Sequence, residues 1–378
     1  MAANLYVHFP FCRSRCSYCS LYSRAGSTAA ERERYVESIR VELESLRVRS
    51  ASTLKTLYFG GGSPALCDLK PLKGTLAPLL GESTEFTVEL HPLDVTPDKL
   101  DELKSIGVNR ISMGVQSLDD GILAHMGRGY TADDAARAFA LAKSRFDNAG
   151  IDLIVGYPGE QFDAPSPSSH VSRLTSLVPS SFSSLRSWGL THCSVYSLQN
   201  ERGLKNVPDD DIVLDRIRAG AAFLKSLGLE RYEISNYAAP GFECRHNLAV
   251  WRGEDYVGLG DGACGREGLA RTRGTKTATR KRPSRRSSTP RREPSSASGR
   301  ATDSTRRASP NGVRRSTASP PRGFSFPWAT ASTASPSAAP KSATQSSPNS
   351  SDLLATSVPA LLKYRSIDFL VWTTAGEI

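Results

Sequence analysis

The chain has 378 residues, enough for one large domain or two, and its formal net charge of +10 is unevenly distributed. From Arg266 onward 20 basic and 6 acidic residues give a net charge of +14. The first 265 residues hold 28 basic and 32 acidic residues, a net charge of −4. We therefore expect no nucleic-acid binding by the folded body. Seven irregularly spaced cysteines, with no visible signal peptide or long apolar segment, predict a cytoplasmic protein without a transmembrane segment.

Strands and helices are predicted to alternate over the first 200 residues. Short apolar runs predict six strands, at residues 5–9, 56–59, 86–90, 110–115, 151–155 and 193–198. Helical spacing of apolar residues predicts helices at 29–48, 66–80, 97–106, 119–126 and 132–143. Such alternation is typical of a parallel sheet with right-handed crossovers. The sequence therefore predicts an α/β fold that contains a partial (β/α)6 barrel.

Three cysteines, Cys12, Cys16 and Cys19, follow the first strand within eight residues. Pro10 ends that strand, so the cysteines are expected on a loop where their thiolates suit iron–sulfur or zinc. A structural zinc site usually has four protein ligands, and a disulfide would leave one cysteine unpaired and needs an oxidising compartment. A [4Fe–4S] cluster on three cysteines leaves one iron open to another ligand. Three unrelated cysteines are the remaining alternative, which is disfavoured because only four others occur in the chain.

Polar residues lie at or near the C-terminal ends of four predicted strands, where (β/α) barrels collect their chemistry. They are Glu89, Gln116, Asp152 and Tyr196. Each alone could be a hydrogen-bonded structural group. Four strands that place one each near the same rim indicate a site.

A glycine run, residues 60–64, follows the second predicted strand and reads Gly-Gly-Gly-Ser-Pro. A tight turn is the default explanation for such a run. The alternative is that the glycines allow the backbone to approach a ligand closely.

The spacing Cys12-x3-Cys16-x2-Cys19, with Tyr18 before the last cysteine, resembles the cluster loop of radical S-adenosylmethionine (SAM) enzymes. The flanking residues 6–11 narrow this to the family of oxygen-independent coproporphyrinogen III oxidases and their HemW-type haem chaperone relatives. The resemblance covers about residues 4–265. It implies that the three cysteines hold a [4Fe–4S] cluster whose open iron chelates the amino and carboxylate groups of SAM.

The resemblance also implies a set of SAM contacts. These are Tyr6, Tyr18, Gly61, Gly62, Ser63, Glu89, Gln116, Arg128 and Asp152. Ser63 stands where the family has threonine and keeps the hydroxyl. The pattern departs at His91, where asparagine is usual, and at Tyr130, where histidine is common. Neither change removes an implied ligand.

A later segment, residues 244–251, resembles the family's Cys-Arg-His-Asn-x-x-Tyr-Trp motif, which is associated with haem binding in the chaperone branch. The haem contacts that this implies are His246, Asn247 and Trp251. Taken from the residues alone, a histidine here is more often a hydrogen-bonded structural group. Val250 replaces the motif's tyrosine, and Cys264 replaces a usual histidine.

The resemblance stops at residue 265, and three regions are expected: a radical SAM core at 1–230, the start of the family's C-terminal region at 231–265, and a tail at 266–378. Up to about residue 350 the tail is Ser-, Thr-, Arg-, Pro- and Ala-rich, so we expect disorder. An out-of-frame stretch explains it best. The alternative is a basic tail that binds nucleic acid or anionic surfaces by counterion release.

Three functions follow. The first is a haem chaperone that binds a cluster, SAM and haem and passes haem to an unidentified acceptor. The second is an oxygen-independent coproporphyrinogen III oxidase, and the third is binding through the tail. True oxidases of the family carry a fourth cysteine two residues after the third and a longer N-terminal extension. In this chain Leu21 occupies that position and the first strand begins near residue 4, which favours the chaperone.

Overall fold

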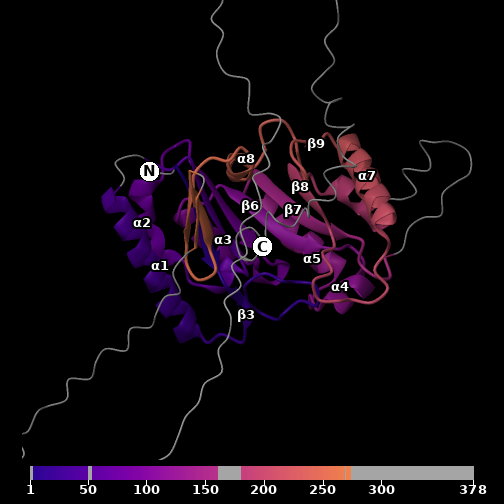
Figure 1. Ribbon diagram of the computed structural model, residues 1–378, viewed down its shortest axis with the longest axis horizontal. Coiled ribbons are helices and arrows are strands. Elements are labelled where there is room, and N and C mark those ends of the chain that lie inside the picture. The colour runs from indigo at the N-terminus through magenta and orange to yellow at the C-terminus, as the bar shows by residue number, and fades with distance from the viewer. Residues whose placement is uncertain (1–2, 50–52, 161–179, 269, 274–378) are drawn as a thin grey trace, which may run out of the picture. The chain divides into compact units, whose positions relative to one another are not determined.

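The computed structural model describes residues 3–49, 53–160, 180–268 and 270–273, and one eleven-stranded sheet runs through this part of the chain (Figure 1). Its six central strands are parallel, and each pairs with the next one along the chain. They are β1 (Asn4–Phe9), β4 (Thr56–Gly61), β5 (Glu85–Leu90), β6 (Arg110–Gln116), β7 (Asn148–Val155) and β8 (His192–Ser197). The predicted α/β fold with a partial (β/α)6 barrel is therefore confirmed.

Shorter strands extend the sheet at both edges. At one edge β11 (Tyr256–Leu259) pairs parallel with β1, and β12 (Cys264–Glu267) and β13 (Ala270–Arg273) follow as an antiparallel hairpin. At the other edge β10 (Asn236–Ala238) pairs antiparallel with β8 and with β9 (Glu230–Arg231). A separate pair, β2 (Phe11–Cys12) and β3 (Arg24–Ala25), lies in the segment that carries the three cysteines. About half of residues 231–265 thus lie in strands of this sheet or in the helix α8 (Arg245–Trp251).

The prediction of disorder from residue 266 onward is wrong for the described residues of the hairpin, 266–268 and 270–273. Backbone pairing with β11 and within the hairpin satisfies N–H and C=O groups of these residues, although their side chains are mostly polar. The turn is closed by Gly268, which has a φ of +59° and donates its N–H to Asp255 Oδ1 at 2.7 Å. The predicted disorder of residues 274–378, and the choice between an out-of-frame and a basic tail, lie outside the described residues.

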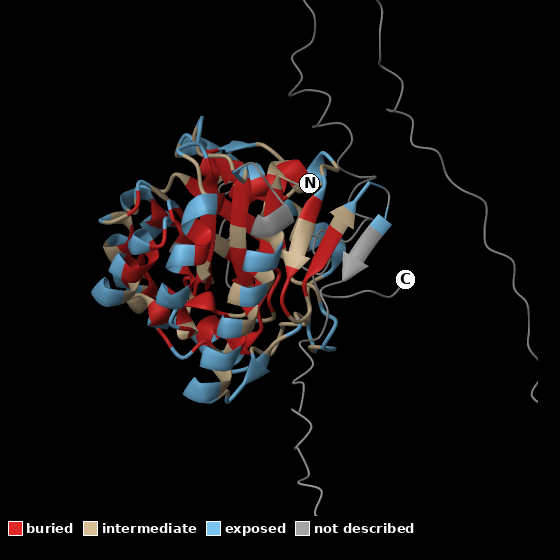
Figure 2. Ribbon diagram, turned by 90° about the vertical axis from the view of Figure 1, so that its left-hand side faces the viewer, coloured by how far each residue is buried: buried red, intermediate tan, exposed pale blue. Residues whose placement is uncertain are grey.

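Helices cover the outer side of the parallel strands, and Figure 2 shows their exposed residues facing away from the buried strands. Four predicted helices correspond to α1 (Ala29–Arg49), α3 (Pro97–Ser105), α4 (Asp120–Met126) and α5 (Ala132–Lys143). Side chains of Thr96, Asp119 and Thr131 accept N–H groups in the first turns of α3, α4 and α5. Later in the chain come η5 (Ser180–Ser187), α7 (Asp210–Ser226) and α8 (Arg245–Trp251).

The predicted helix at 66–80 is wrong. The chain instead forms η1 (Pro64–Leu66), η2 (Lys70–Leu72), the single turn α2 (Lys73–Leu76) and η3 (Ala77–Leu79), and after β5 another short turn, η4 (Pro92–Asp94). Pro71 and Pro78 have no N–H to donate and clash with the preceding turn, so each begins a new short turn and no long helix can pass through them.

Alternation along the strands separates the hydrophobic core from the interior of the barrel. On β6, Ile111 and Met113 belong to the core beneath the helices, whereas Arg110 and Ser112 face the barrel interior. On α1, Ile39 and Leu43 are fully buried against this core, which confirms the predicted apolar face. The interior of the barrel is therefore polar.

None of the helices that the structure describes has both the length and the apolar character needed to span a membrane.

Candidate functional site

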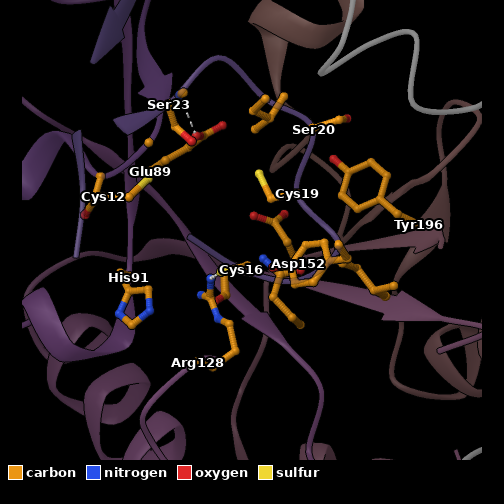
Figure 3. Close-up of a pocket in the computed structure, with 18 of the residues that line it drawn as sticks. Cys12, Cys16, Cys19, Ser20, Ser23, Glu89, His91, Arg128, Asp152 and Tyr196 are labelled. Atoms are coloured by element: carbon orange, nitrogen blue, oxygen red, sulfur yellow. Dashed lines mark hydrogen bonds between the residues drawn. The ribbon is translucent and has the colours of Figure 1, made fainter. Parts of the chain in front are cut away.

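A cavity of about 170 Å³ opens at the C-terminal ends of the central strands, and we call it the rim cavity (Figure 3). It is lined by the three predicted cluster cysteines and by eight of the nine predicted SAM residues: Cys12, Cys16, Cys19, Tyr18, Gly61, Gly62, Ser63, Glu89, Gln116, Arg128 and Asp152. Tyr196, from the end of β8, lines it too, so the four predicted rim residues meet at one place. The ninth predicted SAM residue, Tyr6, lies in a different cavity.

The cysteine loop is anchored to parts of the chain that are distant in sequence. Cys12 ends the short strand β2, and Cys16 and Cys19 follow in irregular structure. The Ser17 N–H donates to the carbonyl of Met126 in α4 at 3.2 Å, and Arg202 Nε donates to the carbonyl of Cys19 at 2.8 Å. The loop therefore has a defined position relative to the strand ends.

The cysteines fit a multi-iron cluster better than a single ion. All seven cysteines of the chain are free, which removes the disulfide alternative. Across the described ranges no three His, Cys, Asp or Glu side chains come close enough together to hold one metal ion. In a [4Fe–4S] cluster each thiolate binds a different iron, so the three sulfurs need not converge on one point. Burial raises the pKa of the Cys12 thiol to about 11 and also raises that of Cys19, so both thiols need a bound cation to become thiolates.

A guanidinium lies directly beside one of these cysteines (Figure 3). Arg128 is buried, and its Nη1 donates to Cys16 Sγ at 3.4 Å. Its Nη2 donates to the carbonyl of Gly114 at 2.5 Å, and its Nε donates to Tyr130 Oη at 3.0 Å. The resemblance implies a SAM contact for Arg128, and the structure adds a hydrogen bond to a cysteine sulfur.

Two carboxyl groups face the rim cavity from different strands of the parallel sheet. Glu89 accepts hydrogen bonds from Tyr58 Oη at 2.9 Å and from the Gly61 N–H at 3.0 Å, and Asp152 accepts from Ser112 Oγ at 3.2 Å. Burial, with repulsion from Asp152 added, raises the pKa of Glu89 to about 7, and burial also raises the pKa of Asp152. Two carboxyl groups that are costly to ionise together favour a ligand that brings positive charge.

The glycine run is explained by packing. Gly61 has a φ of +104°, and a Cβ there would lie 2.4 Å from the His8 ring. A Cβ on Gly62 would lie 2.4 Å from the carbonyl oxygen of Phe11. The backbone needs glycine at both positions before any ligand is considered, so their contact with SAM stays a prediction.

Ser63, next in the run, is committed to a neighbour. Its hydroxyl donates a short hydrogen bond to Asp94, whose other carboxylate oxygen accepts from Arg13 Nε at 2.5 Å. This chain of contacts joins the glycine turn, η4 and the cysteine loop at the edge of the rim cavity. The hydroxyl that replaces the family's threonine thus has a structural partner.

Sequence reasoning missed some features of the site. Gln116 has a φ of +71°, rare for a residue with a side chain, at a register shift between β6 and β7. A Cβ on Gly114 would lie 2.7 Å from Gln116 Nε2, so a side chain there would displace the Gln116 amide. Ser23 makes a hydrogen bond that lowers the pKa of Cys12, against the larger effect of burial.

The haem candidates do not gather at one surface. His246 and Asn247 are buried and, with Tyr6, line a second space of about 40 Å³ inside the barrel, which we call the inner cavity. Trp251, at the other end of α8, is partly exposed. At about 40 Å³ the inner cavity has room for a few atoms only, so it cannot admit a porphyrin in this conformation. The ring of His246 is hydrogen-bonded through Nδ1 to Thr56 Oγ1 at 2.8 Å, which favours the structural alternative.

The chain matches the Radical SAM superfamily over residues 6–165. It is 32% identical to the Heme chaperone HemW of Lactococcus lactis subsp. lactis over 281 residues, which cover 69% of each chain. It is also 33% identical to the Heme chaperone HemW of Mycobacterium tuberculosis over 287 residues, or 71% of this chain and 70% of the relative. The Heme chaperone HemW of Escherichia coli is 32% identical over 276 residues, or 70% of each chain.

Among solved structures, the chain is similar to the coproporphyrinogen III oxidase (HemN) of Escherichia coli, which is a radical SAM enzyme. The TM-score is 0.57 at 22% sequence identity, and the match covers 70% of this chain and 64% of that one. At this identity the likeness shows a shared fold.

Proposed function

This chain belongs to the HemW heme chaperone family of radical SAM proteins, and we propose that it holds a [4Fe–4S] cluster and SAM in the rim cavity and delivers haem to an acceptor protein. The observation that carries the proposal is the composition of the rim cavity, where three cysteines, a buried guanidinium and two partly buried carboxyl groups surround one space. When bound, such a cluster supplies single electrons and an open iron for a further ligand.

The side chains of the rim cavity divide the work. Cys12, Cys16 and Cys19 would hold the cluster, and Arg128 orients one thiolate through its hydrogen bond to Cys16. Glu89 faces the same cavity, where its carboxylate suits the ammonium group of SAM. Asp152, which also lines the cavity, would accept from a ribose or an ammonium group.

Haem as cargo is inferred from what the HemW relatives are called. His246, Asn247 and Trp251 remain the sequence-based candidates for haem contact, and His246 would have to leave its hydrogen bond to Thr56 to reach an iron. Seven free cysteines suit a reducing compartment, so we place the protein in the cytoplasm. We propose that the acceptor is a protein that binds haem.

The experiment that tests the proposal combines three titrations on one preparation of the full chain. After anaerobic reconstitution, iron and sulfide analysis should give one [4Fe–4S] cluster per chain, and SAM should then bind. Haem should bind, as seen in its Soret absorbance, and should move to an added apo-haemoprotein. A preparation that holds the cluster and SAM but never retains or passes on haem contradicts the chaperone assignment.

A coproporphyrinogen III oxidase is the second candidate, favoured by the shared fold with HemN. Against it, Leu21 presents an apolar side chain to the rim cavity at the position where the oxidases carry a fourth cysteine. Incubation with coproporphyrinogen III, SAM and a reductant under anaerobic conditions should therefore give no protoporphyrinogen. Steady product formation would replace the chaperone proposal with the oxidase.

A further inference from the structure

The inner cavity lies inside the barrel and shares part of its wall with the rim cavity. Glu89, Asp152 and Tyr196 line both spaces. The rest of the inner cavity is formed by inward-facing residues of the strands, among them Arg110 and His192, and by the helix α8. Its volume of about 40 Å³ is room for a few atoms only, and its wall combines apolar surface with polar side chains from several strands.

One of those groups is a buried guanidinium without full hydrogen bonding. Arg110 is 1% exposed and begins β6. Its Nε and Nη2 are buried, and neither has a hydrogen-bond partner among the described residues. A buried cation whose N–H groups are unpaired is strongly unfavourable, so Arg110 calls for an acceptor that the described part of the chain does not supply.

A second unpaired donor belongs to His192, which is also 1% exposed. Its Nε2 lies 2.8 Å from Tyr232 Oη, and that hydroxyl accepts the N–H of Cys244 at 3.2 Å. The Tyr232 hydroxyl can donate to His192 Nε2 or accept from it, and when it donates the ring proton lies on Nδ1. Nδ1 is buried and has no partner among the described residues, so in that tautomer it is a further N–H that needs an acceptor. Burial lowers the pKa of His192, so the ring is neutral.

The nearby carboxylates are already engaged elsewhere. Glu85 accepts the N–H groups of Arg245 and His246 at 2.9 and 3.0 Å and so fixes the start of α8. Glu89 accepts from Tyr58 and from the backbone, and Asp152 accepts from a serine hydroxyl. Their charges act on Arg110 through space, but none forms a hydrogen bond to its Nε or Nη2.

We propose that the inner cavity is a binding site for a small anion, such as formate or a halide, held by the N–H groups of Arg110 and His192. An anion accepts hydrogen bonds from both residues at contact distance from the guanidinium, and because Glu89 and Asp152 line the same cavity it binds with those carboxyl groups protonated. A water molecule also accepts, but it brings two hydrogens of its own and no charge. The size of the cavity excludes SAM and porphyrins, so this ligand is additional to those of the proposed function.

The test is thermal unfolding of the full chain, reconstituted with its cluster, in formate and in gluconate at equal ionic strength. Gluconate carries the same charge but is too large for the cavity. Formate in about tenfold excess over its dissociation constant should raise the unfolding midpoint by about 2–4 °C over gluconate. Arg110→Met should abolish this difference. Arg216→Met should keep it, because Arg216 is paired with Glu160 at 2.9 Å and does not line the cavity.

Two further measurements decide the question if Arg110→Met does not fold. Tyr232→Phe removes the hydroxyl that can donate to His192 Nε2 and so keep the ring proton on Nδ1, and it should reduce the formate effect while leaving Arg110 in place. Crystals of the wild-type chain soaked in bromide should show an anomalous peak beside Arg110. Equal midpoints in formate and gluconate, or water alone beside Arg110 in the bromide soak, overturn the proposal. None of these readouts uses SAM or haem, so their failure is separate from a failure of the proposed function.

Discussion

Replacing Glu89 by glutamine should change both the strength and the pH dependence of SAM binding. Burial and Asp152 raise the pKa of the free Glu89 carboxyl from 4.5 to about 7. A ligand ammonium favours the ionised form, so below pH 7 Glu89 has to lose a proton when SAM binds. Affinity of the wild type should therefore fall about tenfold for each pH unit below about 7 and level off above it.

The Glu89→Gln variant keeps the shape of the side chain and loses the charge. A hydrogen bond to a charged group contributes about 1.5–3 kcal/mol, so at pH 8 the variant should bind SAM about 10–150-fold more weakly than the wild type. Its affinity should also vary little between pH 6 and pH 8, which lie on either side of the pKa of about 7. Isothermal titration of the anaerobically reconstituted protein with SAM measures both quantities.

Glu160 provides a matched control. Burial raises the pKa of its carboxyl to about 7 as well, but it accepts from the Gly156 N–H at 2.8 Å and from Arg216, and it does not line the rim cavity. Glu160→Gln should leave the pH profile of SAM binding unchanged. If Glu89→Gln keeps the wild-type profile, or if the profile flattens only in Glu160→Gln, the assignment of Glu89 to the SAM ammonium is refuted.

Three further predictions concern the cluster and haem. Cys16→Ala should abolish the cluster absorbance on reconstitution, whereas Cys67→Ala, a buried cysteine outside the rim cavity, should leave it intact. Arg128→Met should lower the midpoint potential of the cluster, because it removes the N–H···S contact to Cys16. The expected drop is about 60 mV for each 1.4 kcal/mol by which that contact favours the reduced cluster. An unchanged potential would show that this contact does not tune the cluster. His246→Ala should lower the unfolding free energy by about 1–3 kcal/mol, because it removes a buried hydrogen bond, and should weaken haem, SAM and cluster binding together. Selective loss of haem binding in that variant would instead support iron ligation by His246.

The strands and the rim could be predicted because both depend on local rules. Apolar runs mark strands, and parallel strands in a barrel bring their C-terminal ends to one rim, so Glu89 and Asp152 meet although 62 residues separate them. The helix predicted at 66–80 is wrong because an apolar period alone gives too little weight to Pro71 and Pro78. Composition also missed the hairpin after residue 265, because pairing at a sheet edge depends on backbone hydrogen bonds and only weakly on composition.

The position of His246 illustrates why a motif does not give the depth of its residues. The motif suggests an accessible iron ligand, but Glu85 caps the start of α8 and thereby turns His246 into the barrel. There its ring lies 5.2 Å from that of Tyr58 and is hydrogen-bonded to Thr56. That placement depends on an acidic residue 161 positions earlier in the chain, a pairing that no local pattern predicts.

Arg110 extends the same reasoning to the whole interior of the barrel. The sequence predicts Arg110 only as the first residue of a strand. The alternation of residues along that strand does not predict whether its inward face contacts apolar side chains or unpaired polar atoms. The structure shows that the inward face continues from Arg110 through Ser112 to Gly114 at the rim cavity. The charge of Arg110 also lowers the carboxyl pKa values of Glu89 and Asp152, against the larger effect of burial. An anion held by Arg110 would cancel that effect, so occupancy of the inner cavity and ionisation at the rim cavity must be coupled.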